Sequence, residues 1–295
     1  TADFLDVALG REFDDRARPM NIISVSDPGF DSIFSGNTTD ICPVGALTTS
    51  DFRFGARPWE LDAAPSICAQ CPVGCNTVLN TRREAKSDGE IVVKRVMPRQ
   101  NEEVNEIWLC DKGRFAYHYA EGKGRLTKPM IRKEKKLARS SWDAATKLAA
   151  EKFSKDKKDF VVLASGRLSN EDLFNLKTLA DHAGGKAYLY SRMADGELTS
   201  LVGVSAGTDF GTMGAGTAIV VVASDLYQQA PLWYLRVKQA AERGATLIVV
   251  NPRETKLDRY ASFKVRYGYG DEVKAIHDLA KTGKESDALL KSGNV

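Results

Sequence analysis

Four unevenly spaced cysteines constrain this chain more than any other feature of its sequence. Cys68, Cys71 and Cys75 fall within eight residues, and Cys110 follows after 34 intervening residues, which gives the pattern C-x2-C-x3-C-x34-C. Three thiolates on one short loop can occupy three corners of a compact cluster, and a distant fourth thiolate can close the cage. The grouping therefore predicts one metal centre that ties this loop to a remote part of the chain.

Two kinds of centre use four thiolates, the [4Fe–4S] cubane and a structural zinc ion. Zinc sites are usually built from two separated C-x2-C pairs, each of which supplies two corners of a tetrahedron. The three-plus-one grouping of this chain is a poor match to that arrangement. We predict a [4Fe–4S] cluster, with zinc on the same thiolates as the alternative. The predicted ligands are Cys68, Cys71, Cys75 and Cys110.

The fifth cysteine, Cys42, stands apart from this set. A secreted disulfide framework normally combines a short chain with an even number of cysteines, whereas this chain has five in 295 residues. We therefore expect reduced thiols that serve as metal ligands in a reducing compartment. From the residues alone, Cys42 is interpreted as a single buried thiol.

The composition excludes several other classes of protein. The net charge of +3 is too small to argue for nucleic acid or an anionic membrane surface as a partner. No apolar run approaches the roughly 20 residues that cross a bilayer, so direct membrane insertion is not expected. The first residues have neither the basic nor the apolar region of a signal peptide. Because the chain lacks an initiator methionine and stops without a closing element, we expect it to be part of a longer protein.

The secondary-structure pattern changes along the chain. Strand-like runs at residues 76–80 and 91–96 are separated by turn residues at 86–89, which predicts an antiparallel hairpin beside the cysteines. From about residue 140, strands and helices alternate, and this rhythm predicts a parallel sheet with helices on both faces. The expected strands are 160–164, 187–190, 218–222 and 245–250. One helix is expected to begin at Trp142, a second to begin at Ser169, and a third to span 232–243.

Little in the sequence argues for substrate chemistry. Gly166 follows a predicted strand, but residues 166–169 lack the G-x-G-x-x-G fingerprint, so no NAD site is predicted. No Ser/His/Asp or paired-carboxylate arrangement can be argued, and no catalytic residue is assigned. Lys112, two residues after Cys110, either shields the cluster charge or contacts a neighbouring redox centre, or else is a solvated surface lysine. The residues alone thus favour electron transfer over substrate conversion.

Several segments resemble a known family. The sequences AQCPVGCN at residues 69–76 and CDKGR at 110–114 resemble the [4Fe–4S] domain at the start of molybdopterin oxidoreductases. More closely, residues 30–47 and 51–59 resemble the G subunit, the large iron–sulfur subunit, of bacterial NADH:quinone oxidoreductase, respiratory complex I. The sequence VNPRET at 250–255 is similar to the pterin-binding α/β domain of formate dehydrogenases and nitrate reductases, with an ordinary strand end and turn as the other interpretation.

The resemblance implies an α/β protein with three parts. Residues 1–62 are the remainder of an upstream iron–sulfur domain. Residues 63–119 are a small, mostly irregular and β-rich [4Fe–4S] domain of the molybdenum/tungsten enzyme type. Residues 120–295 are an incomplete, doubly wound parallel-sheet domain of the molybdopterin-oxidoreductase type.

The resemblance also gives Cys42 a role. In that family the cysteine of the C-P-V-G-A-L motif is the last ligand of a separate [4Fe–4S] cluster, whose other ligands form an upstream C-x2-C-x2-C motif. Cys42 matches this ligand, but the upstream triplet is absent here, so the second cluster is expected only in the full-length protein. No cysteine follows Cys110, and the complex I relatives keep the downstream domain as a scaffold, so no molybdopterin is expected.

The implied function is an electron-transfer subunit of NADH:quinone oxidoreductase that passes electrons from NADH toward quinone through iron–sulfur clusters. The expected partners are other peripheral-arm subunits of complex I, which bind NADH and quinone. The expected location is peripheral, on the cytoplasmic side of the inner membrane. The alternative from another class is a piece of a catalytic molybdopterin oxidoreductase such as formate dehydrogenase. A third hypothesis is a non-redox scaffold that zinc holds together.

Overall fold

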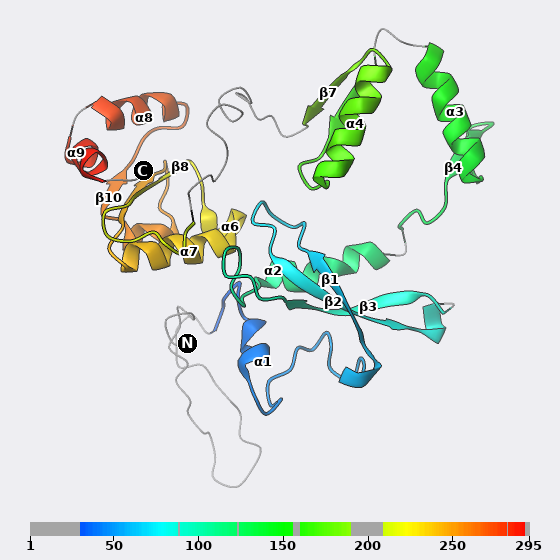
Figure 1. Ribbon diagram of the computed structural model, residues 1–295, viewed down its shortest axis with the longest axis horizontal. Helices are drawn as coiled ribbons and strands as arrows, with labels where there is room; N and C mark the ends of the chain where they lie inside the picture. The colour runs from blue at the N-terminus through cyan, green and yellow to red at the C-terminus, as the bar shows by residue number, and fades with distance from the viewer. Residues whose placement is uncertain are drawn as a thin grey trace. The chain divides into compact units, whose positions relative to one another are not determined.

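The computed structural model of the protein (Figure 1) describes residues 30–87, 89–122, 124–155, 160–189, 209–281 and 283–292. The chain forms two compact units. The first combines Thr1–Tyr117 with Gly207–Val295, and the second is His118–Ala206. Residues 1–29 of the first expected part, and residue 190 at the end of an expected strand, lie outside the described residues.

A three-stranded antiparallel sheet carries the cysteine-rich part of the first unit. Its order is β1 (Asp62–Ile67), β2 (Asn76–Arg83), β3 (Ile91–Pro98). The predicted hairpin between β2 and β3 is confirmed, with Arg83 opposite Ile91 next to the turn. Strand β1 was not anticipated, because Pro65 argues against a strand. Proline is tolerated here because β1 lies at the edge of the sheet.

Two short helices accompany this sheet. Helix α1 (Asn37–Ile41) ends at Cys42, and helix α2 (Asp111–Phe115) begins directly after Cys110. The segment before α1 lies against the start of α2, since the Asp111 amide donates to the Ile33 carbonyl at 2.7 Å. The two cysteines outside the loop between β1 and β2 are thus placed at the ends of helices.

The first unit also contains a parallel sheet in the order β10 (Phe263–Val265), β9 (Thr246–Val250), β8 (Ala218–Val222). Strand β9 is completely buried from Leu247 to Val250, and its side chains alternate between two apolar clusters. Leu247 and Val249 pack with α7 (Pro231–Glu242), while Ile248 and Val250 pack with α8 (Glu272–Lys281) and α9 (Lys284–Lys291). The predicted parallel sheet with helices on both faces is confirmed for the strands at 218–222 and 246–250, but the expected strands at 160–164 and 187–190 do not join it and pair with each other in the second unit.

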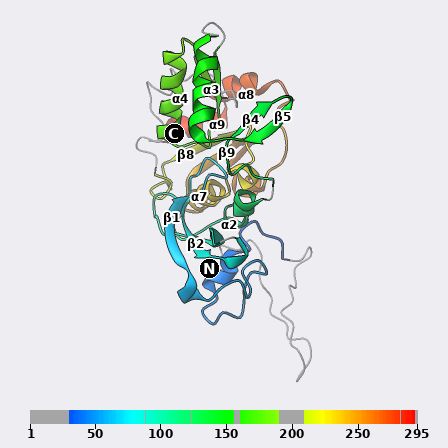
Figure 2. The ribbon, with the colours of Figure 1, turned by 90° about the vertical axis from the view of Figure 1, so that its right-hand side faces the viewer.

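The second unit has its own short sheets. Strands β4 (Met130–Lys133) and β5 (Lys136–Arg139) form an antiparallel hairpin, visible in Figure 2. Strands β6 (Val161–Ala164) and β7 (Lys186–Leu189) pair in parallel, and α4 (Asn170–His182) lies against both. The predicted start of α4 is confirmed, because the Ser169 hydroxyl accepts from the Asp172 amide at 3.1 Å. Helix α3 (Trp142–Lys155) begins where the sequence predicts.

In the part of the chain that the structure describes, the remaining elements are the short helix α6 (Leu226–Gln229) and four 3-10 helices, Pro58–Glu60, Ala85–Ser87, Ala116–Glu121 and Lys256–Tyr260. Within the described ranges, no helix combines the length and the apolar character that crossing a bilayer requires.

Close backbone packing at Gly185 yields a test of the second unit. A Cβ at this position would lie 2.8 Å from the Phe160 carbonyl carbon and closer still to its oxygen, to which the Lys186 amide donates. We expect Gly185→Ala to lower the free energy of unfolding by about 1–3 kcal/mol, as overpacking does. Gly166→Ala, where a Cβ would meet nothing within 4 Å, is the matched control. Urea denaturation measures both, and equal stabilities would contradict the packing.

Candidate metal centre

Three of the four predicted ligands lie on the loop that joins β1 to β2. Ile67 and Asn76 are paired across the two strands, so residues 68–75 form the connection. The Cys68 amide donates to the Cys75 carbonyl at 2.8 Å and closes the loop at its base. Gly74 has φ +66°, a backbone conformation that glycine adopts without strain. The loop is therefore short, closed at its base and sharply bent.

The fourth ligand approaches this loop from the segment after β3. Asn105 is almost fully buried, with 1% of its surface exposed, and its side-chain oxygen accepts from the Asn76 amide at 2.9 Å. Its side-chain nitrogen donates to the Trp108 carbonyl at 3.2 Å. Asn105 thus links the residue after Cys75 to the segment that leads to Cys110. This side chain sets the approach of the fourth sulfur to the other three.

The structure brings the four thiols together in a buried environment. Cys75 and Cys110 expose 1% and 3% of their surfaces, and Cys68 and Cys71 pack against the same apolar cluster. Burial raises the pKa of the Cys75 thiol, and the charges of the other three sulfurs raise it further. Burial likewise raises the pKa of Cys110 to about 11. Because a nearby like charge disfavours ionisation, the Cys75 sulfur lies within electrostatic reach of the other three.

Polar groups at the rim favour the charged form of the sulfurs. Burial raises the pKa of Cys68, but the Gln70 amide and the positive charge of Lys112 oppose this shift. The Gly113 amide acts in the same direction on Cys110. A Cβ at Gly113 would lie 3.2 Å from the Cys68 sulfur and 2.9 Å from a Leu109 methyl carbon, so this position has no room for a side chain.

The donor set fits an iron–sulfur cluster. It consists of four thiols, backbone amides directed at two of the sulfurs, and an enclosing apolar wall, which are the features that hold and tune such clusters. In a zinc site, bond lengths of about 2.3 Å bring the four sulfurs to within about 4 Å of one another. Among the described residues, no three His, Cys, Asp or Glu side chains are arranged about one metal ion.

Cys42 lies on a different element from the four thiols, directly after α1. Hydrogen bonding from the backbone amides of four residues favours the charged form of its sulfur. The Leu47 amide has the largest effect, and together the four lower the pKa of Cys42 below its ordinary value. The amides belong to Val44, Gly45, Ala46 and Leu47. A nest of amides of this kind stabilises a thiolate, the form of cysteine that binds metals.

Two family models match parts of this chain. A model of the molybdopterin oxidoreductase family matches residues 125–286, and a model described as an NADH-ubiquinone oxidoreductase NDSU1/NuoG-like 4Fe-4S domain matches residues 63–118. The chain therefore belongs to the molybdopterin oxidoreductase family and carries a 4Fe-4S domain of the NuoG-like type. The second match supports an iron–sulfur cluster in the part of the chain that holds the four thiols.

Curated relatives agree with this classification. The chain is 34% identical to the G subunit of the NADH-quinone oxidoreductase of Streptomyces coelicolor over 72% of its own length. It is 32% identical to NADH-quinone oxidoreductase subunit 3 of Thermus thermophilus over 91%, and 31% identical to the G subunit of the Mycobacterium bovis oxidoreductase over 99%. These alignments cover 27%, 34% and 37% of the three relatives, so the chain spans about a third of their length.

Sequence reasoning missed the polar residues that position the cysteines. Asn105 binds a partner 29 residues away, and Asn37 binds a carbonyl 72 residues away. Nothing in the local sequence distinguishes either asparagine from one exposed to solvent. Arg114, two residues after Lys112, falls in the CDKGR segment, and it is the arginine rather than the lysine that the fold buries.

The opposite pKa shifts of Cys42 and Cys110 predict different reactivities in the metal-free protein. At pH 8 a larger fraction of Cys42 is thiolate, so iodoacetamide should alkylate it more than about tenfold faster than Cys110. Mass spectrometry of the two peptides over time measures both rates. Unfolding in guanidinium should make the two alkylation rates similar. Equal rates in the folded protein would contradict the burial of the Cys110 thiol.

Proposed function

We propose that Cys68, Cys71, Cys75 and Cys110 hold one [4Fe–4S] cluster and that this chain transfers electrons without converting a substrate. The observation that carries the proposal is the convergence of four thiols on one apolar cluster, two of which, Cys75 and Cys110, are buried; burial and the charge of the neighbouring sulfurs raise the pKa values of these two thiols. Iron offsets both effects, because its positive charge stabilises the thiolates that bind it. Cysteines that serve only to pack the core do not need to lie in one group of four.

The residues around the four thiols suit one-electron transfer. When bound, a [4Fe–4S] cluster supplies a centre that accepts and returns an electron with little rearrangement. Amides of Gln70 and Gly113 donate toward the sulfurs, and Lys112 places a positive charge near Cys68. These groups offset the negative charge that reduction adds, and the apolar wall limits access of water. Both effects set the reduction potential of the cluster.

Cys42 is proposed as the last ligand of a second [4Fe–4S] cluster in the full-length protein, with its other ligands upstream of this chain. The amides of residues 44–47, directed at its sulfur, support this role, because they stabilise the thiolate without any positively charged side chain. The two clusters would then occupy the ends of α1 and α2.

The parent assembly is proposed to be NADH:quinone oxidoreductase, and this proposal rests on the names of the relatives. The partners would be other peripheral subunits, which bind NADH and quinone. The chain would lie on the cytoplasmic side of the inner membrane without entering it, and no nucleic acid is a partner.

The α/β part is proposed to be a scaffold that binds no molybdopterin. A second candidate, a catalytic molybdopterin oxidoreductase such as a formate dehydrogenase, is favoured by the family match over residues 125–286. One of the ligands that such enzymes use for molybdenum, a cysteine, is absent after Cys110. The boundaries proposed for the parts remain residues 1–62, 63–119 and 120–295.

Anaerobic reconstitution with iron and sulfide tests the cluster. We expect about four iron atoms per chain and an EPR signal after reduction. Cys110→Ser should remove most of the signal, because one corner of the cage is lost. Cys42→Ser is the matched control and should leave the signal unchanged, because this chain lacks the other ligands of the second cluster. A colourless protein that takes up one zinc ion instead would reject the electron-transfer function.

Metal analysis of the full-length protein separates the two candidate functions. Under the scaffold proposal, the purified protein contains iron but neither molybdenum nor tungsten, and its denatured extract lacks pterin fluorescence. One molybdenum or tungsten per chain, together with that fluorescence, would establish the molybdopterin enzyme. Inductively coupled plasma mass spectrometry on anaerobically purified protein makes the measurement.

A further inference from the structure

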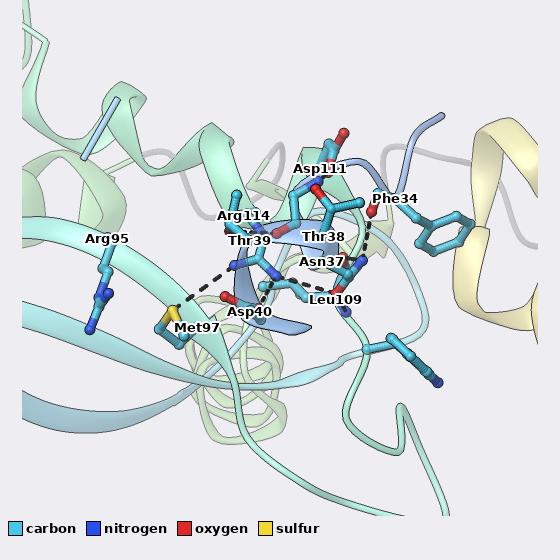
Figure 3. A network of polar contacts seen from close by, with 12 residues as sticks. Phe34, Asn37, Thr38, Thr39, Asp40, Arg95, Met97, Leu109, Asp111 and Arg114 are labelled. Carbon is cyan, nitrogen blue, oxygen red and sulfur yellow. Dashed lines mark hydrogen bonds and ion pairs between the residues drawn. The ribbon is translucent and has the colours of Figure 1, made fainter. Parts of the chain in front are cut away.

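The segment that leads to Cys110 is held from two sides, and the first is a network of polar side chains around Asn37 (Figure 3). Asn37 lies in α1 and has 1% of its surface exposed. Its side-chain nitrogen donates to the Leu109 carbonyl at 2.7 Å, and its side-chain oxygen accepts from the Leu109 amide at 3.1 Å. Arg114 of α2 also donates to this oxygen, at 3.3 Å. The residue directly before Cys110 is therefore fixed through both of its backbone groups.

The second hold on this segment comes from Arg236 of α7, which is 6% exposed although it carries a charge. Its guanidinium pairs with the Glu106 carboxylate and donates to the Glu102 carbonyl at 2.8 Å. The exposed carboxylate of Asp209 lies 3.8 Å from the same group. The Nε atom of Arg236 is buried and has no hydrogen-bond partner among the described residues. Helix α7 thus places one buried cation directly on the segment that precedes the fourth cysteine.

Glu106 connects this cation to the wall of the metal centre. One oxygen of its carboxylate pairs with the guanidinium, and the other accepts from the Trp108 indole nitrogen at 3.1 Å. Trp108 packs against the apolar cluster that contains Cys75 and Cys110. Its backbone amide and carbonyl are both bonded to Asn105, at 2.8 and 3.2 Å. A single carboxylate therefore joins α7 to an aromatic ring beside the four thiols.

The backbone of Glu106 is strained. Its φ is +49°, in the left-handed region that residues with a Cβ rarely adopt. This conformation closes a turn, because the Asn101 amide donates to the Glu106 carbonyl at 2.9 Å and the Glu106 amide donates to the Asn101 carbonyl at 2.7 Å. Strained residues of this kind persist where surrounding contacts over-determine them, and they gather at functional sites. The ion pair with Arg236 is such a contact.

We propose that Arg236 is a positioning residue for the four-cysteine cluster and that it acts through Glu106 and Trp108. The proposal rests on the proposed function, since it requires a cluster on the four thiols. Arg236 holds Glu106 in its left-handed conformation, and Glu106 holds the Trp108 ring against the apolar wall, where the ring limits the access of water. The α/β part of the first unit thus tunes the cluster, although no cofactor is proposed for that part.

The burial of the arginine argues that this contact serves geometry. The side chain of Arg236 is 7% exposed and that of Glu106 is 24% exposed, so the arginine bears most of the cost of desolvation. An apolar residue of similar size would avoid this cost. A planar guanidinium, however, fixes a carboxylate in direction as well as in distance. A residue held in a strained conformation requires a contact with both properties.

The test is a redox titration of the anaerobically purified full-length protein, followed by the EPR signal that Cys110→Ser removes. Arg236→Lys keeps the charge, but a single ammonium group cannot reproduce the planar contacts to Glu106 and Glu102. We expect unchanged iron content, altered g values, faster loss of the signal in air and a more positive midpoint potential. The potential rises because water admitted past Trp108 stabilises the reduced cluster, which carries the greater negative charge.

Trp108→Phe provides a second variant, which keeps an aromatic ring and the net charge but removes the N–H group that donates to Glu106. It should shift the midpoint potential in the same direction. Arg243→Lys is the matched control. Arg243 directly follows α7 and donates to the Met213 and Phe210 carbonyls in exposed contacts, so the potential and the g values should stay unchanged.

The proposed function and the positioning role fail in different ways. An unmodified protein without an EPR signal that depends on Cys110 would refute the proposed function. If the signal is present and both variants keep its potential and g values, the positioning role alone is refuted, even where the melting temperature falls. A shift in Trp108→Phe without one in Arg236→Lys would also refute it, because the ring would then act independently of the arginine.

Discussion

The grouping of four thiols against one apolar cluster, with Cys75 and Cys110 buried, is the constraint on which the rest of the structure depends. Iron binds the thiolate, yet burial and the neighbouring sulfurs raise the pKa values of Cys75 and Cys110 and so disfavour that form. The charge of iron offsets both effects. The fold therefore has two tasks: to bring the sulfurs together before the metal arrives, and to supply amides that share the negative charge afterwards. The closed loop at Cys68, the buried Asn105 and the missing side chain at Gly113 each serve the first task.

The parallel sheet contributes to the same centre from the other half of the first unit. Strand β9 is buried on both faces, and the face that packs with α7 belongs to the apolar cluster that includes Cys75 and Cys110. Arg236 of α7 pairs with the Glu106 carboxylate and donates to the Glu102 carbonyl at 2.8 Å. Both glutamates belong to the segment that leads to Cys110. The α/β layer thus supports the path of the fourth ligand, a role that needs no cofactor in the layer itself.

The sequence predicts the elements whose signals are local. The hairpin between β2 and β3 follows from turn residues between two strand-like runs, and α4 begins at a capping serine, Ser169. The convergence of the four sulfurs follows from their spacing, because three lie on one loop. The network around Asn37 is different in kind. Its hydrogen bond to Leu109 spans 72 positions of the sequence, and its hydrogen bond from Arg114 spans 77. No local pattern encodes such a distance. Strand β1 was missed for the opposite reason. Its proline is a local signal against a strand, but a proline is tolerated at the edge of a sheet, where β1 lies.

Position along the chain explains why the network lies where it does. Cys42 and Cys110 are far apart in sequence, and each sits at the end of a five-residue helix. Helices this short have little stability of their own, so tertiary contacts must hold them. Apolar packing alone would allow one helix to shift against the other, because dispersion contacts have no direction. Hydrogen bonds from Asn37 to both backbone groups of Leu109 remove that freedom at the residue before Cys110. A helix end fixed in this way can hold a metal ligand in one place, which an isolated helix of the same sequence could not do.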